Sequence, residues 1–222
     1  EVPVDPHDLG ETARACMPTI LQAFLGRPDD TPAGDAFERR LYVCRRTIEK
    51  KADAEFALRD KIFYVCSMSS RTIVYKGMLV ATQMRRFFID LNDAAVKTAV
   101  ALVHSRYSTN TTPSWERAHP NRFIIHNGEI NTLKGNVNWI RAREPNLYSP
   151  VLQHDLERVM PIINREGSDS AILDNVLEFL VMNGRPLTRA ASMLLPEPWD
   201  HNDSLSEERR AYDAYQSMLM EP

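Results

Sequence analysis

The 222-residue sequence predicts an α+β domain, because β-rich runs and helical patterns each occur in groups rather than in regular alternation. The composition agrees with a globular fold: 43% of the residues are hydrophobic and 26% are charged. A chain of this length forms one large domain or a segment of a bigger protein. We therefore expect residues 1–222 to be part of a single domain.

The first elements are short. Asp8 and Glu11 have the spacing of a capping box, which predicts a short helix that Pro18 ends. Residues 19–25 are typical of a strand, and Gly26 follows it.

A longer helix is predicted over residues 35–53. Its apolar residues recur at intervals of four, three and four, which places them on one helical face. These residues are Phe37, Leu41, Cys44 and Ile48.

Four β-rich runs occupy the middle of the sequence. Residues 61–69 and 71–77 predict a hairpin, and a short helix should follow over residues 78–88. Residues 97–108 and 121–128 are so apolar that we expect two buried strands.

Three helices are predicted towards the C-terminus, over residues 129–143, 169–182 and 207–219. The second of them should end before Gly184. The first two have apolar faces that we expect to be buried. They comprise Ile130, Leu133, Val137 and Ile140, and then Ile172, Val176, Phe179 and Leu180.

Charge and cysteine content exclude several classes of function. The net charge is -3, with acids and bases interspersed, so a nucleic-acid partner is not expected. No apolar run is long enough to span a membrane. The cysteines Cys16, Cys44 and Cys66 form neither a disulfide framework nor a metal-binding pair. We expect all three to be buried structural residues in a reducing, cytoplasm-like compartment.

Polar residues cluster in three segments, 104–110, 126–131 and 167–170, where an apolar run ends or a helix begins. Each segment alone has a structural explanation. Arg106 could lie on the surface, and Asn127-Gly128 is a common turn dipeptide. Ser168 or Asp169 could cap a helix.

Together the three segments suggest a pocket for a zwitterionic amino acid. Arg106 offers the planar donor fork that suits an α-carboxylate, and Asp169 offers a carboxylate for an α-ammonium. The side-chain amide of Asn127 and the backbone N–H of Gly128 could stabilise an oxyanion formed by attack on an amide.

Two other kinds of site are less favoured by the sequence. His104 and His126 could bind a metal, but no third ligand stands at suitable spacing, and hydrogen-bonded histidines are favoured. The segment from Gly167 to Ser170 lacks the second glycine of a nucleophile elbow.

The segments 37–50, 63–79, 101–144 and 165–185 resemble the class II glutamine amidotransferase (glutaminase) domains of glutamate synthases. The long run HNGEINTLKGNVNW, which starts at His126, carries most of the resemblance. It implies a four-layer α/β/β/α sandwich of the N-terminal-nucleophile hydrolases, with two antiparallel sheets face to face. This chain would supply a large part of it, incomplete at the N-terminal side.

The resemblance also implies roles for individual residues. Arg106 would bind the glutamine α-carboxylate with support from Thr109, and Asp169 would bind the α-ammonium. Asn127 and Gly128 would form the oxyanion hole. The substrate-binding wall would further include Tyr107, Gly167 and Ser168. Tyr107 stands where related amidotransferases often have Trp, which leaves its role open.

The resemblance places the nucleophile on a cysteine at the mature N-terminus. This sequence starts at Glu1, which corresponds to a position inside the domain. We therefore expect the nucleophile to be absent and the chain alone to be inactive.

For the complete enzyme, the resemblance implies FMN and an iron–sulfur cluster, neither of which should bind this segment. The expected partners are glutamine and the remaining domains of the large subunit. The expected location is the cytoplasm, or the plastid in a plant.

Two other functions stay open. A non-catalytic module could use a glutaminase-like fold for binding or assembly. The missing nucleophile favours that interpretation, whereas the intact set of substrate-binding residues argues against it. An N-terminal-nucleophile hydrolase of another amide would keep the oxyanion pair. It would not need both Arg106 and Asp169.

Overall fold

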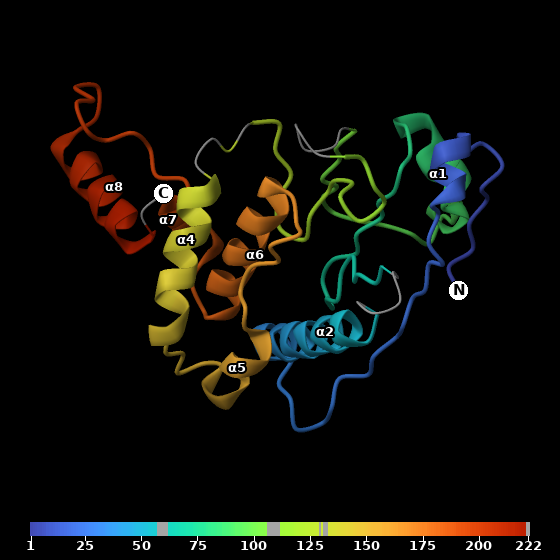
Figure 1. Ribbon diagram of the computed structural model, residues 1–222, viewed down its shortest axis with the longest axis horizontal. Coiled ribbons are helices and arrows are strands. Elements are labelled where there is room, and N and C mark those ends of the chain that lie inside the picture. The colour runs from blue at the N-terminus through green and yellow to red at the C-terminus, as the bar shows by residue number, and fades with distance from the viewer. Residues whose placement is uncertain (57–61, 106–111, 129, 131–132, 221–222) are drawn as a thin grey trace.

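The computed structural model describes residues 1–56, 62–105, 112–128, 130 and 133–220, and the regular elements of this part are helices (Figure 1). The α-helices are α1 (Glu11–Ala15), α2 (Asp35–Phe56), α3 (Met84–Phe87), α4 (Leu133–Arg143), α5 (Leu156–Val159), α6 (Asp169–Met182), α7 (Leu187–Leu194) and α8 (Glu207–Met220). Short 3-10 helices are η2 (Ala81–Gln83), η3 (Ile89–Asn92), η4 (Glu144–Asn146) and η5 (Gln153–Asp155).

The larger hydrophobic core lies among α2, α4, α5, α6 and α7. Val159 and Ala190 are fully buried in it, and Ile163 and Met193 are nearly so. Figure 1 shows α4, α6 and α7 close together, with α2 and α5 below them and α8 at the outer edge. This core therefore organises the C-terminal half of the chain around α6.

A smaller core lies at the opposite end of the molecule, beside α1 and α3. Phe87, Phe88 and Trp115 form its centre, with 1%, 3% and 3% of their surface exposed. The rings of Phe87 and Phe88 meet edge to face, with centroids 4.8 Å apart. The indole N–H of Trp115 donates to the carbonyl oxygen of Ala13 at 3.0 Å. This hydrogen bond attaches the loop that contains Trp115 to α1.

The predicted helix over residues 169–182 is confirmed at both ends. The hydroxyl of Ser168 accepts the N–H of Ala171 at 3.2 Å and caps the first turn. Gly184 follows the last turn with φ +85°, a conformation that favours glycine. The four apolar residues expected on the buried face are all buried: Ile172, Val176, Phe179 and Leu180.

The other predicted helices are present, with small differences between their predicted and observed ends. The helices predicted over residues 78–88 and 207–219 are present as η2 with α3, and as α8. The first residue of α4 is Leu133, later than the start predicted at residue 129, and Ile140 is its buried residue. The capping box of α1 is absent, because Gly10 is the N-cap and makes no side-chain bond.

The predicted buried face of α2 is wrong in its second half. Cys44 is exposed and Ile48 is 37% exposed, whereas Arg45 is 1% exposed. Ion pairs with Glu49 and with Glu178 of α6 compensate the burial of this arginine. Hydrophobic periodicity could not predict this, because it assigns charged residues to the solvent side.

The predicted strands are wrong for the residues that the structure describes. An isolated antiparallel bridge joins Val4 and Phe88, and none of the described residues belongs to a strand of several residues. The α+β class and the four-layer α/β/β/α sandwich are therefore not observed, since a sheet requires several residues of each strand to pair.

Two of the β-rich runs show features that differ from a paired strand. In the expected hairpin, the N–H groups of Arg71 and Thr72 donate to the hydroxyl of Ser69 at 3.0 and 3.2 Å. In the run after residue 97, Val100 is 74% exposed and Val103 is 77% exposed. This run has the composition of a buried strand, but no strand among the described residues pairs with it.

Candidate functional site

The N-terminus of α6 presents one part of the predicted site. Asp169 occupies its first turn and is half-buried, and Ser168 is buried as the N-cap. Gly167 precedes them in a turn in which its N–H donates to the carbonyl oxygen of Asn164 at 3.1 Å. Helix capping therefore explains the burial of Ser168. It also fixes the backbone of the first turn, from which the Asp169 side chain projects.

The segment that leads to Asn127 is attached to the same helix. The carboxylate of Asp174, 1% exposed, accepts the backbone N–H groups of Arg122, Phe123 and Ile124 at 3.1, 2.7 and 2.9 Å. Burial raises the pKa of the Asp174 carboxyl, and the charge of Glu178 adds to the effect, while these N–H groups oppose it. A buried carboxylate needs hydrogen-bond donors. The three backbone N–H groups meet this need, and they attach residues 122–124 to α6 through Asp174.

A second attachment lies one turn earlier on α6. Nε2 of His126 lies 2.6 Å from the hydroxyl of Ser170, which is fully buried. The same hydroxyl lies 3.1 Å from Oδ1 of Asp169. The residue before Asn127 is thus connected through one hydroxyl to Asp169.

Three histidine rings extend this connection towards the segment that carries Arg106. The rings of His104 and His119 have centroids 4.5 Å apart, and those of His119 and His126 are 5.8 Å apart. Burial and the nearby charges of the other two histidines lower the pKa of His119 to about 4. His119 is therefore neutral near pH 7, and it separates two rings that would repel each other if both were charged.

The structure therefore brings together one residue from each of the three polar segments, next to or near the predicted site residues. His104 precedes Arg106 by two positions, His126 precedes Asn127, and Ser170 follows Asp169. Each flanking residue packs on, or bonds to, the next.

The predicted site residues themselves are only partly covered by the structure. Asn127 and Gly128 are exposed, while Gly167 is half-buried. Arg106, Tyr107 and Thr109 lie outside the described residues. The convergence of Arg106 and Asp169 on one pocket therefore stays a prediction.

The cysteines are placed differently from the prediction. Cys16 and Cys44 are exposed rather than buried, and Cys66 is partly buried. Burial raises the pKa of the Cys66 thiol, and a raised pKa disfavours the nucleophilic thiolate. The thiol of Cys16 donates to the carbonyl oxygen of Thr12 at 3.1 Å, as expected of an ordinary residue at a helix end.

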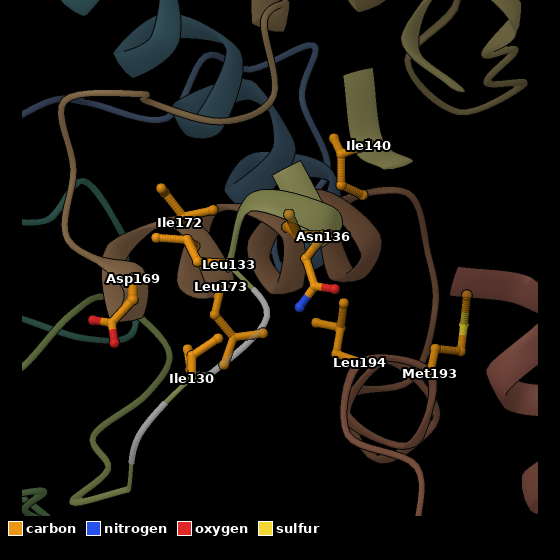
Figure 2. A pocket seen from close by; sticks show the side chains of 10 residues that line it. Ile130, Leu133, Asn136, Ile140, Asp169, Ile172, Leu173, Met193 and Leu194 are labelled. Atoms are coloured by element: carbon orange, nitrogen blue, oxygen red, sulfur yellow. The ribbon is translucent and has the colours of Figure 1, made fainter. Parts of the chain in front are cut away.

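A cavity of about 50 Å³ lies between α4, α6 and α7, behind the N-terminus of α6. Figure 2 shows Asp169 at one end of it, with its carboxylate turned away from Asn136 and Leu194. The lining is otherwise mostly apolar and includes Ile130, Leu133, Ile172 and Val176. An apolar space does not suit a zwitterion, so the candidate site is the outer side of Asp169.

In the part of the chain that the structure covers, no three His, Cys, Asp or Glu side chains are arranged to hold a metal ion. None of the helices described there is long and apolar enough to cross a bilayer.

Two residues of this arrangement escaped the sequence prediction. His119 lies in a loop, and no periodicity links it to His104 or His126. Ser170 was visible only as part of a possible helix start. The sequence shows histidines in or near the polar segments. Only the fold shows that their rings lie next to one another.

The family described as "Glutamine amidotransferases class-II" matches the chain over residues 1–222. The large chain of the NADPH-dependent glutamate synthase of Bacillus subtilis is 50% identical over 221 residues. This match covers 100% of the present chain and 14% of that protein.

Two further relatives show the same pattern. The NADH-dependent glutamate synthase of Schizosaccharomyces pombe is 44% identical over 230 residues, which cover 100% of this chain and 10% of the relative. The ferredoxin-dependent glutamate synthase 1 of Arabidopsis thaliana is 40% identical over 225 residues, covering 99% of this chain and 14% of the relative. The chain thus spans a small part of each of these proteins.

Proposed function

The chain belongs to the class II glutamine amidotransferase family, and from this we propose that it forms part of the single glutaminase domain of a glutamate synthase large chain. The complete domain hydrolyses glutamine to glutamate and ammonia. The ammonia then reacts with 2-oxoglutarate at another site, and reduction gives a second glutamate.

One observation supports the proposal above all others: residues from the three polar segments, joined by His119, form a continuous row. The row runs from His104 over His119 to His126, and then through Ser170 to Asp169. A site for one zwitterionic amide needs donors and acceptors from all three segments at the same place, and this row is consistent with that need.

In the proposed site, Arg106 binds the α-carboxylate of glutamine, and Thr109 and Tyr107 support it. Arginine suits this role because its planar fork makes two parallel hydrogen bonds to a carboxylate. Asp169 binds the α-ammonium from the exposed side of α6. Gly167 and Ser168 shape the wall beside it.

Asn127 and Gly128 act at the other end of the substrate. A thiolate attacks the side-chain amide carbon, and the carbonyl oxygen becomes an oxyanion that accepts from the Asn127 amide and the Gly128 N–H. Collapse of this intermediate expels ammonia and leaves a γ-glutamyl thioester. Water then releases glutamate and regenerates the thiol.

We assign the thiolate to none of the three cysteines of this chain. Cys66 has a raised pKa, and Cys16 bonds to its own helix. Cys44 is exposed in the middle of α2. The buried side of this helix carries the ion pairs of Arg45 instead. None of them stands in the row of residues that leads to Asp169.

FMN and the iron–sulfur cluster of the complete enzyme are assigned to other parts of the protein. An iron–sulfur cluster needs several cysteine thiolates around one centre, and the three cysteines here lie far apart in sequence and differ in burial. The residues of this chain thus do not fit such a cluster.

The proposal is tested in a full-length glutamate synthase that carries this segment. Arg106→Lys and Asp169→Asn should each raise the KM for glutamine by roughly tenfold or more, because a charged hydrogen bond is lost or weakened. Glutamate formation from free ammonia should stay unchanged. Arg143→Lys on α4 serves as the matched control. Unchanged KM values in both site variants would show that these residues do not bind glutamine, as expected of a non-catalytic module.

A further inference from the structure

The hydroxyl of Ser170 occupies a central position between two parts of the proposed site. It lies 2.6 Å from Nε2 of His126 and 3.1 Å from Oδ1 of Asp169. Ser170 is fully buried, so water does not compete for these contacts. The backbone N–H of Ser170 also donates to Oδ1 of Asp169, at 2.6 Å.

The carboxylate fixes the direction of these hydrogen bonds. An ionised carboxylate only accepts, and a serine hydroxyl has a single hydrogen to donate. When Ser170 donates this hydrogen to Asp169, its oxygen is left to accept from His126. Nε2 of His126 therefore carries a proton and donates it to Ser170.

The directed chain couples two elements that contact opposite ends of glutamine. His126 is bonded covalently to Asn127, which leads to the oxyanion donors, and Asp169 binds the α-ammonium. The bonds from Asp174 to residues 122–124 hold the preceding part of the same segment on α6. The segment is thus attached to the helix at two points, one turn apart.

We propose that His126 and Ser170 are positioning residues for glutamine, which set the distance between Asp169 and the oxyanion donors Asn127 and Gly128. Neither of the two touches the reacting atoms. The inference rests on the proposed function. It adds that the two ends of the substrate site must be held at a fixed distance from each other. Both ends of the substrate depend on one hydrogen-bonded hydroxyl.

This arrangement predicts a distinctive kinetic effect. Asp169→Asn acts on the ammonium end and should change mainly KM, whereas a change at Asn127 should change mainly kcat. Loss of the His126 donor or of the Ser170 hydroxyl should alter KM and kcat together. Since both changes break the same chain, their effects should not add.

The experiment uses a full-length glutamate synthase with His126→Leu, Ser170→Ala, the double variant and His126→Gln. The two single variants should each lower kcat/KM for glutamine roughly 10- to 100-fold, the range expected for hydrogen bonds to a charged group. The kcat/KM of the double variant should be no lower than that of the less active single variant. His126→Gln should recover most of the activity, because its amide N–H reaches the position of Nε2.

Two controls separate positioning from damage to the fold. Glutamate formation from free ammonia should stay within about twofold of wild type in every variant, as should glutamine turnover by His154→Leu, whose ring is 79% exposed. Multiplying losses in the double variant, or a His126→Gln variant as poor as His126→Leu, would overturn the inference. So would an equal loss in the ammonia-driven reaction.

The proposed function fails in a different way. In that case wild type releases no ammonia from glutamine, or Asp169→Asn leaves the KM for glutamine unchanged. This result also removes the basis for the positioning role. Normal dependence on Asp169 together with silent His126 and Ser170 variants overturns the positioning role alone.

Discussion

Arg45 of α2 and Glu178 of α6 form an ion pair in the interior, with 1% and 7% of their side chains exposed. Arg45 also pairs with Glu49 on its own helix at 2.8 Å. Burial alone would lower the pKa of the Arg45 guanidinium, but the charges of Glu178 and Glu49 raise it above its usual value. The pair joins α2 to α6, and the segment that leads to Asn127 contacts both helices, since Arg122 donates to Glu49 of α2 at 3.0 Å.

Replacing Glu178 by Gln should destabilise the protein markedly. The substitution keeps the shape but leaves Arg45 with less compensation for its buried charge. Breaking one side of a buried pair in this way costs about 3 kcal/mol. Chemical denaturation should therefore show a lower free energy of unfolding for Glu178→Gln.

The matched control for this prediction is Asp30→Asn. Asp30 pairs with Arg40 at 3.3 Å, but their side chains are 74% and 56% exposed. Exposed pairs contribute at most about 1 kcal/mol. Equal losses in the two variants would contradict the structural importance of the buried pair.

Gly77→Ala should also destabilise the protein, because a Cβ atom at this position would meet ring carbons of Trp115 at 2.4 and 2.7 Å. Trp115 is 3% exposed and bonded to Ala13, so its ring has little freedom to move. Overpacking of this kind costs about 1–3 kcal/mol. The thermal midpoint should fall. In the control, Gly10→Ala, a Cβ atom meets nothing within 4 Å, and an equal fall there would refute the steric explanation.

The elements that could be predicted from sequence are those specified by local signals. Helix α6 has a capping serine, an apolar face and a glycine after its last turn, and its observed bounds match the prediction. The helix predicted over the charged residues 207–219 is likewise present, as α8 (Glu207–Met220).

The predicted strands and sheets failed because strand pairing depends on a partner that local propensity does not specify. Residues 97–105 have the composition of a strand, yet Val100 and Val103 are largely exposed. The site shows the same limit. The motifs around Asp169 and Asn127 were visible in the sequence, whereas the packing of the His119 ring beside those of His104 and His126 depends on the fold.

The stability of the protein should fall in mild acid, in part through His119. Its pKa is lowered to about 4 by burial and by His104, His126 and Lys76, while Asp169 opposes the shift. The unfolded histidine binds a proton below about pH 6.5, and the folded one does so only near pH 4. The unfolded state therefore binds more protons in this window, so the free energy of unfolding decreases as the pH falls through it.

The contribution of His119 is isolated by comparison with His119→Gln. Unfolding curves at pH 7 and pH 5 should show a larger acid-induced loss of stability for wild type than for the variant. His154→Gln, at an exposed position, should behave as wild type. Identical pH dependence in wild type and His119→Gln would contradict the assigned shift.

The 222-residue chain alone should not hydrolyse glutamine, because the proposed nucleophile is none of its three cysteines. Ammonia release from glutamine by the purified chain should equal that of a no-protein control. Release well above this level, abolished by Cys16→Ser, Cys44→Ser or Cys66→Ser, would identify a nucleophile within the chain and refute the assignment.

The most direct test of the glutaminase site is the turnover number for glutamine of Asn127→Asp in a full-length glutamate synthase. The change replaces a neutral donor by a carboxylate that repels the oxyanion, so kcat should fall by at least ~10²–10³-fold, the usual loss for one such donor. The KM should change far less, and synthesis from free ammonia should persist. Asn138→Asp, at an exposed position on α4, is the control. An Asn-Gly turn tolerates aspartate, so a near-normal kcat in Asn127→Asp would contradict the account and leave Asn127 as a turn residue.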